Sequence, residues 1–273
     1  MTYFGFLLIF LVLPILIFLP ITYWDSRKDK KGNHFRSGRA VWLGIAIHVL
    51  LAVAYTTPWD NYLVATKVWS YNPGLVTGLV IGYVPVEEYT FFILETVLSG
   101  LWWWFLARRI SPPRHELQTN SRSLYIAAGI LMFVWLVFTY LFFRGDPPLT
   151  YLSITLFWAL PPIVIQLLFG ADILWQYRRL VTLAILIPGA YLSLTDMVAL
   201  QGTTWSISPS QTTGILFFGI LPLEEVVFFF ITNVLITFGL TLFLANASQG
   251  RFAGIRNRIQ AWNAKRGTNP QAR

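Results

Sequence analysis

Residues 82–98 read GYVPVEEYTFFILETVL, and in this run Glu87, Glu88 and Glu95 interrupt a segment otherwise apolar enough to cross a membrane. A charged side chain at the centre of a bilayer costs roughly 3 kcal/mol even on insertion scales. Ionisable residues kept inside membrane segments usually mark a substrate path or a proton path. The stretch therefore predicts a transmembrane helix with a chemical task.

The composition is that of a membrane protein. Of 273 residues, 56% are hydrophobic and 12% are charged, and the charged share is about half that of an ordinary globular chain. The apolar residues form blocks near the length of about 20 residues that a membrane-spanning helix needs. We therefore predict an all-α polytopic membrane protein with seven transmembrane helices, at roughly 3–23, 38–56, 75–106, 122–143, 150–170, 180–200 and 211–245.

Basic residues alternate between the two sets of loops. The loops after the first, third and fifth blocks and the tail after the seventh hold all 20 Lys and Arg except Lys67 and Arg144. Basic loops stay on the cytoplasmic side, which predicts an integral plasma-membrane protein with its N-terminus outside and its C-terminus in the cytoplasm. Attraction to anionic lipid headgroups accounts for the net charge of +8, so no nucleic acid partner is expected.

The opening stretch has a second copy later in the chain. VPVEEYTFFILETVL (84–98) aligns without gaps to LPLEEVVFFFITNVL (221–235), and upstream WSYNP (69–73) matches WSISP (205–209). Asp60 lies near the position that matches Asp196, and more weakly Tyr3 matches Tyr151. The alignment pairs Pro85, Glu87, Glu88, Phe91 and Phe92 with Pro222, Glu224, Glu225, Phe228 and Phe229.

These copies predict an internal duplication. One helix between two three-helix units restores the chain direction, so the units should be parallel and related by an axis along the membrane normal. The predicted parts are a first repeat (1–110), a connector with helix 4 (111–149), a second repeat (150–245) and a basic amphipathic cytoplasmic tail (246–273). The halves are not identical, since Glu95 matches Thr232.

The third and seventh blocks are too long for single spans. Helical throughout, each would reach roughly 50 Å, against a hydrocarbon core of about 30 Å. Pro85 and Pro222 are expected to kink or break these helices, because an interior proline removes a hydrogen bond and clashes with the preceding turn. Counted from the outer ends of the blocks, both Glu-Glu pairs then lie near the membrane midplane, facing each other across the axis.

Adjacent carboxyl groups in a low dielectric do not both ionise cheaply, so one is expected to hold a proton while its neighbour is charged. An acid beside a base is what proton-transfer chemistry needs, and we predict Glu87, Glu88, Glu224 and Glu225 as the acid–base set. Neighbours on a helix point about 100° apart, which leaves open which glutamate of each pair faces a ligand. Polar support is expected from Asp60, Asn61, Glu95, Asp196 and Asn233.

Phenylalanines one helical turn from the acids could stabilise a cation with their π faces: these are Phe91, Phe92, Phe228 and Phe229. His48, alone in the second block, is interpreted as a structural, hydrogen-bonded histidine. The chain has no cysteine, its three histidines do not cluster, and it lacks glycine-rich nucleotide motifs. No metal site and no cofactor are therefore predicted.

A duplicated P-x-E-E motif before a Phe-Phe-rich helix, with TPWDNYL (57–63) ahead of the first copy, resembles the integral-membrane lycopene cyclase family. In that family two three-helix units are separate subunits or are fused, and the layout also resembles seven-helix rhodopsins. The resemblance covers nearly the whole chain. It implies cyclisation of lycopene ends to β-ionone rings without net redox change or a cofactor: a proton adds to a terminal double bond, the carbocation closes a six-membered ring, and a proton is lost.

The resemblance also implies partners and leaves alternatives. It implies a lipophilic carotenoid substrate taken from the bilayer, in one pocket that holds one end at a time. A cyclase of a longer, prenylated C50 carotenoid and a proton-coupled transporter stay as alternatives. Three points stay open: whether one or both ends are cyclised, whether the ring is β, ε or γ, and whether the chain forms a homo-oligomer or a complex with other carotenoid enzymes.

Overall fold

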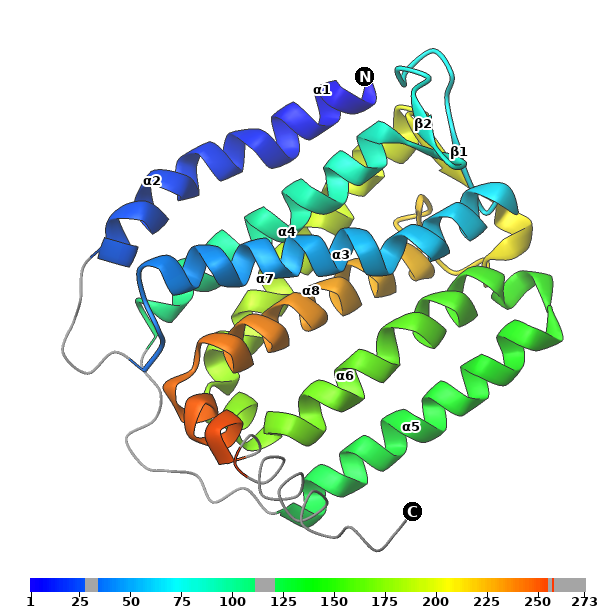
Figure 1. The fold of residues 1–273 in the computed structure, drawn as a ribbon. Helices are drawn as coiled ribbons and strands as arrows, with labels where there is room; N and C mark the ends of the chain where they lie inside the picture. The colour runs from blue at the N-terminus through cyan, green and yellow to red at the C-terminus, as the bar shows by residue number, and fades with distance from the viewer. Residues whose placement is uncertain (28–33, 111–120, 255–256, 258–273) are drawn as a thin grey trace, which may run out of the picture.

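The computed structural model describes residues 1–27, 34–110, 121–254 and 257. In this part of the chain seven helices are long and apolar enough to cross a membrane, which confirms the predicted all-α membrane protein. The long helices lie side by side along one common direction, and the N-terminus lies at the same end as the loop that carries β1 and β2 (Figure 1).

The first span runs from α1 (Tyr3–Leu7) through a π-helical turn (Leu8–Val12) into α2 (Leu13–Arg27). The other long helices are α3 (Arg39–Ala65), α4 (Val86–Ala107), α5 (Ser121–Arg144), α6 (Thr150–Gln176), α7 (Arg178–Gln201) and α8 (Leu223–Leu244). Short strands occupy the loops before α4 and α8: β1 (Trp69–Tyr71), β2 (Val80–Ile81), β3 (Val84–Pro85), β4 (Trp205–Ile207), β5 (Leu216–Phe217) and β6 (Leu221–Pro222). Two 3-10 turns, η2 (Pro147–Leu149) and η3 (Pro209–Gln211), complete the structure.

Helices α4 and α8 form the centre of the bundle. They pack against each other and against α3 and α7, while α2 covers α4 and α6 covers α8. Helix α5 lies at the edge, against α6 (Figure 1). Between the central helices Trp103 is fully buried, and its indole N–H donates to Thr241 Oγ1 at 2.9 Å. The two helices that carry the acidic pairs are therefore the core of the protein.

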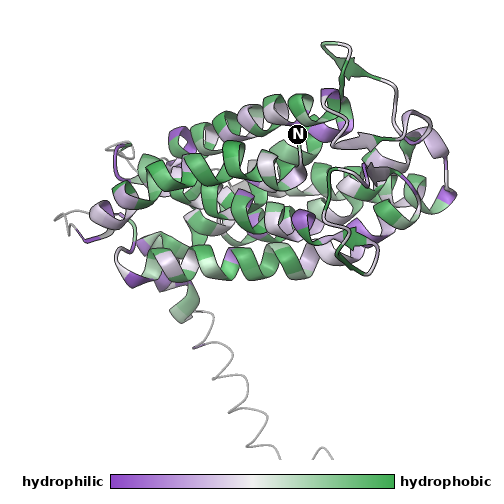
Figure 2. Ribbon diagram, turned by 90° about the horizontal axis from the view of Figure 1, so that it is seen from above, coloured by the Kyte–Doolittle hydropathy of each residue, from purple (hydrophilic) through white to green (hydrophobic). Residues whose placement is uncertain are grey.

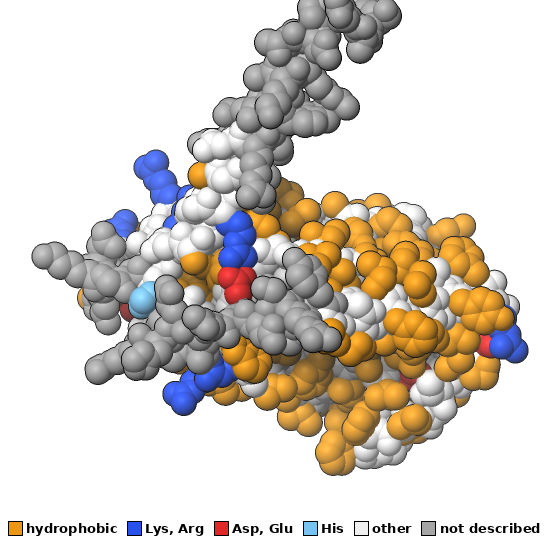
Figure 3. Space-filling view, turned by 90° about the horizontal axis from the view of Figure 1, so that it is seen from below, with side chains coloured by type: hydrophobic (Ala, Val, Ile, Leu, Met, Phe, Trp, Pro, Cys, Tyr) orange, Lys and Arg blue, Asp and Glu red, His pale blue; other side chains and the backbone are white. Residues whose placement is uncertain are grey.

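The outer surface of the bundle is apolar. Leu50, Phe143 and Ile165 are among many large hydrophobic side chains that are more than half exposed. Hydrophobic residues colour most of the helical length in Figure 2, and in Figure 3 hydrophobic side chains cover a broad area with charged groups near its ends. A surface of this kind is stable only against lipid, which is consistent with a bundle that spans the membrane.

The predicted boundaries of the third and seventh blocks are wrong. Helix α4 begins at Val86 and α8 at Leu223, and Pro85 and Pro222 are the residues that precede them rather than kinks inside them. A proline has no N–H and disfavours helix at the residue before it. Upstream the chain turns back at Gly82, whose φ of 68° suits the tight turn between β2 and β3.

The observed starts of α4 and α8 also change where the two Glu-Glu pairs lie. Both Glu-Glu pairs lie in the first turn of their helices, at the end of the bundle where the two loops meet, and not inside a longer helix as predicted. The two loops pair directly, with β1 antiparallel to β4 and Ser70 opposite Ser206. The start of α4 and the start of α8 are therefore held close to each other at equal height.

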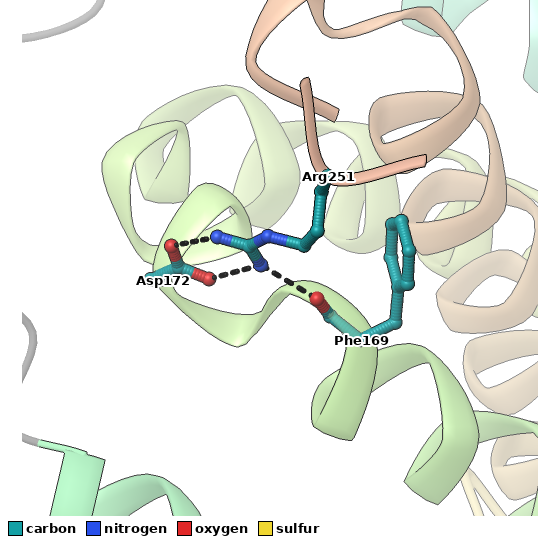
Figure 4. Close-up of polar contacts among 3 residues, drawn as sticks. All are labelled: Phe169, Asp172 and Arg251. Carbon is teal, nitrogen blue, oxygen red and sulfur yellow. Dashed lines mark hydrogen bonds and ion pairs between the residues drawn. The ribbon is translucent and has the colours of Figure 1, made fainter. Parts of the chain in front are cut away.

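At the opposite end of the bundle the chain after α8 is attached to α6. A helical segment over 246–254 follows α8, and its Arg251 donates to both carboxylate oxygens of Asp172, at 2.9 and 2.6 Å, and to the carbonyl of Phe169 (Figure 4). The rings of Phe169 and Phe252 also pack, with centroids 4.8 Å apart. Most of the predicted amphipathic tail, including Ile259 and Trp262, and residues 111–120 of the connector lie outside the described residues.

Candidate active site

Glu88 of α4 and Glu225 of α8 line the same internal cavity. Both side chains are buried, with exposed fractions of 7% and 4%. The rings of Phe91, Phe228 and Phe229 form part of the same wall. The second glutamate of each pair thus faces the cavity, which is the point that the helical angle alone left open.

Glu87 and Glu224 point elsewhere. Glu87 Oε1 accepts a hydrogen bond from the backbone N–H of Thr77 at 2.6 Å, and Glu224 Oε1 accepts one from Thr213 at 2.7 Å. Both side chains are fully buried, yet neither lines the cavity. These two glutamates connect the first turn of each helix to the loop before it, so the structure brings together two of the four predicted acids.

Three tyrosines contact the cavity glutamates, and sequence reasoning had not assigned them to the site. The hydroxyls of Tyr3 and Tyr71 donate to Glu88 Oε2, the latter at 3.0 Å. The hydroxyl of Tyr151 donates to Glu225 Oε1 at 2.9 Å. Burial, together with the charge of Glu88, raises the pKa of Tyr71 well above its ordinary value, so this phenol keeps its proton and acts as a donor. The match between Tyr3 and Tyr151 was the available signal.

Of the two matched aspartates, Asp196 lies in the site. It lines the cavity and accepts a hydrogen bond from the indole N–H of Trp205 at 2.8 Å. Asp60 is also buried, at 2% exposed, but it does not line the cavity, and its Oδ2 has no hydrogen-bond partner among the described residues. Three acidic side chains therefore line the cavity: Glu88, Glu225 and Asp196.

The other predicted polar residues lie outside this cavity. Asn61 accepts a hydrogen bond from the N–H of Tyr83 at 2.8 Å and so holds the β2–β3 turn. Asn233 accepts one from Ser99 at 2.8 Å, which joins α8 to α4. Glu95 accepts one from Thr232 at 2.9 Å. Asn61 and Asn233 thus join neighbouring segments away from this cavity, and Glu95 lines a different cavity.

The predicted phenylalanines form a continuous aromatic cluster between α4 and α8. Ring centroids lie 6.2 Å apart for Phe91 and Phe229, 6.5 Å for Phe92 and Phe228, and 5.4 Å for Phe228 and Phe229. Only Phe92 of the four does not line the cavity of the acids. An aromatic face near a developing positive charge stabilises it by about 0.5–2 kcal/mol.

This cavity, which is lined by Glu88, Glu225 and Asp196 and is called the acidic cavity below, is small, with a volume of about 30 Å³. That is enough for a water molecule or two, since one water needs about 10–15 Å³ by the same measure. Two carboxyl groups from different helices, with phenol donors and aromatic walls, can give and take protons next to an apolar ligand. Such a ligand can reach them only if the walls move.

Relatives in other organisms resemble this chain over most of its length. It is 37% identical over 210 residues to the lycopene beta-cyclase of Halobacterium salinarum, which covers 75% of this chain and 84% of that protein. It is 32% identical over 212 residues to the bifunctional lycopene cyclase/phytoene synthase of Podospora anserina, or 75% of this chain and 36% of the fungal protein. No family model and no solved structure matches. Because the archaeal similarity spans most of both chains, this protein belongs to the lycopene cyclase family.

Proposed function

We propose that this chain is a lycopene beta-cyclase that closes β-ionone rings by proton transfer inside the membrane. The observation that carries this proposal is the shared cavity of Glu88 and Glu225, with its aromatic walls. One carboxyl group gives a proton to the terminal double bond of lycopene. The cation then attacks the neighbouring double bond to form a six-membered ring, and loss of a ring proton to a carboxylate ends the reaction. The atoms of substrate and product are the same, so no electrons are exchanged.

The surrounding residues suit each step. Hydrogen bonds from Tyr3, Tyr71 and Tyr151 orient the two carboxyl groups. Phe91, Phe228 and Phe229 offer π faces to the cation, and their rings keep water from trapping it as an alcohol. Asp196 is a third group that can hold the released proton in the same cavity. We assign to Glu87 and Glu224 the task of fixing the loops above the site.

One end of the substrate reacts at a time. Glu88 and Glu225 line one cavity at one end of the bundle, whereas an extended lycopene is about as long as the hydrocarbon core is thick, roughly 30 Å. The two ends of one molecule therefore cannot occupy the acids together. For two rings the one-ringed product leaves and returns reversed, giving γ-carotene first and β-carotene second.

The test is pigment analysis of lycopene-accumulating cells that express the chain. We expect one-ringed product to appear before two-ringed product. A membrane-inserted chain that leaves lycopene unchanged would overturn the proposal. If the chain converts only C50 carotenoids in a parallel strain, its substrate is a C50 carotenoid and not lycopene.

We also propose that the spans form parallel 3+1+3 repeats, with the unit boundaries 1–110, 111–149, 150–245 and 246–273. Matched hydrogen bonds support this: Glu87 to Thr77 beside Glu224 to Thr213, and Tyr3 to Glu88 beside Tyr151 to Glu225. A third matched pair joins the hydroxyl of Tyr55 to the carbonyl of Trp158 and that of Tyr191 to Phe10, both at 2.8 Å.

The distribution of Lys and Arg supports a plasma-membrane protein with the N-terminus outside. Because the chain has no cysteine, single introduced thiols report this topology cleanly. An impermeant maleimide applied to intact cells is expected to label Lys67→Cys, and to label Arg179→Cys only after permeabilisation. The reverse labelling pattern would show that the chain has the opposite orientation, with its N-terminus in the cytoplasm.

A further inference from the structure

A second and larger cavity opens on the side of the bundle. Its volume is about 230 Å³, and it lies between α3, α4, α6 and α8. Helices α3 and α6 both pack on α8 but touch each other little, and in Figure 1 α8 is visible between them. Leu51, Ala52 and Pro162 on its wall stand near the middle of α3 and α6. This lateral cleft therefore opens on the apolar side of the bundle, about half-way along α3 and α6.

Aromatic rings of the lateral cleft contact an aromatic ring of the acidic cavity. Phe92 and Trp158 line the lateral cleft, and Phe228 lines the acidic cavity. The ring of Phe228 lies 6.5 Å from that of Phe92 and 6.4 Å from that of Trp158, centroid to centroid. No hydrogen bond joins these three rings, so displacing the partition that they form costs packing alone.

The two cavities lie at different heights along α4. Glu95 lines the lateral cleft and Glu88 the acidic cavity, and seven residues of helix separate them by roughly 10 Å. A rod-shaped hydrocarbon in the cleft can advance this distance along the helix to bring its end to Glu88. The acidic cavity of about 30 Å³ cannot hold such an end unless the partition yields.

The opposite side of the bundle differs at the matched position. Counted from the matched Tyr3 and Tyr151, Gln166 of the lateral cleft corresponds to Phe18 of the first span. The ring of Phe18 packs edge-on against Trp102 and Phe105, with both centroids at 5.5 Å. Gln166 of α6 therefore lies beside open space, whereas Phe18 at the matched position of the first span is a packed ring.

We propose that the lateral cleft between α3 and α6 is where the isoprenoid chain of the substrate enters and binds, and that Phe92, Trp158 and Phe228 move aside to admit its end to Glu88 and Glu225. This inference rests on the proposed cyclase function. The lining favours a hydrocarbon, since it is mostly aliphatic and aromatic and opens toward lipid. Two of its polar side chains are engaged within the protein: Glu95 accepts from Thr232, and the amide N–H of Gln166 donates to the carbonyl of Leu235.

Two matched variants test the path. Leu51 lines the lateral cleft and is 58% exposed, and Ile187 is its counterpart on α7, 45% exposed. Leu51→Trp is expected to lower the rate of lycopene conversion about tenfold or more, because the larger indole fills the space in which the hydrocarbon chain would lie. Ile187→Trp should leave the rate close to that of the original chain. Equal rates in both variants, at equal protein levels, would overturn the proposal.

A labelling experiment separates binding from turnover. In bilayers, lycopene is expected to slow the reaction of a maleimide with Leu51→Cys but not with Ile187→Cys. If the original chain makes no rings while lycopene still protects Leu51→Cys, the cyclase function fails and the lateral cleft stands as a polyene site. If rings form but lycopene slows the maleimide reaction of neither thiol, the cleft binds only lipid acyl chains and the inference is wrong.

Discussion

Glu88→Gln and Glu225→Gln are each expected to lower lycopene conversion by about 100-fold or more, whereas Glu87→Gln is expected to keep most of the activity. Removing a positioned acid or base typically costs a factor of about 10²–10⁴. Glu88 and Glu225 line the acidic cavity. Glu87 instead accepts a hydrogen bond from Thr77 N–H, and a glutamine oxygen can accept the same bond.

The measurement is the initial rate of ring formation in membranes with equal amounts of each variant. Glu224→Gln provides the matched control on α8, since Glu224 accepts from Thr213 as Glu87 does from Thr77. Loss in Glu88→Gln alone would locate the chemistry on α4. Equal losses in Glu87→Gln and Glu88→Gln would contradict the division of roles between the two glutamates of each pair.

Trp103→Ala is expected to lower the free energy of unfolding by about 3–5 kcal/mol, the cost of removing a large aromatic side chain from a core. The indole is fully buried between α4 and α8, its ring lies 5.0 Å from that of Phe35, and it donates to Thr241. Thr241 Oγ1 also donates to the carbonyl of Thr237, so its hydroxyl keeps a partner and most of the loss comes from packing.

The free energy is measured by denaturant titration in mixed micelles. Trp175→Ala is the control, because this tryptophan is 53% exposed and its removal opens no internal cavity. Trp103→Phe should fall between the original chain and Trp103→Ala. Similar losses from Trp103→Ala and Trp175→Ala would show that α4 and α8 are not the packed core of the bundle.

Hydropathy was enough to count the spans, because a span is recognised by its average hydropathy over about 20 residues, the length of one membrane-spanning helix. The same measure misplaced the starts of α4 and α8. Leu75, Val80 and Ile81 are as apolar as the helix that follows, so hydropathy cannot distinguish an apolar loop from a helix. The loop is stabilised by backbone pairing, including β1 with β4, whose residues lie far apart in the chain. Pro85 marked the break, but not the shape of the chain before it.

The acids were recognisable from the duplicated motif, but their partners were not. Tyr3 reaches Glu88 across 85 positions of sequence, and Tyr151 reaches Glu225 across 74. The same limit applied to the supporting residues. Asn61 and Asn233 looked similar to Asp196 as buried polar groups, yet only Asp196 lines the acidic cavity. Such assignments depend on how each helix is rotated about its axis.

The number of spans, the duplicated acidic motif and the family resemblance are properties of local composition and order, and the residues alone were enough to infer them. The choice of Glu88 and Glu225 over their neighbours, the position of the acids at the end of the bundle, and the lateral cleft between α3 and α6 all required the folded chain. They arise from contacts between distant segments, and those contacts select one helix rotation and one loop pairing among several that the same local pattern would allow.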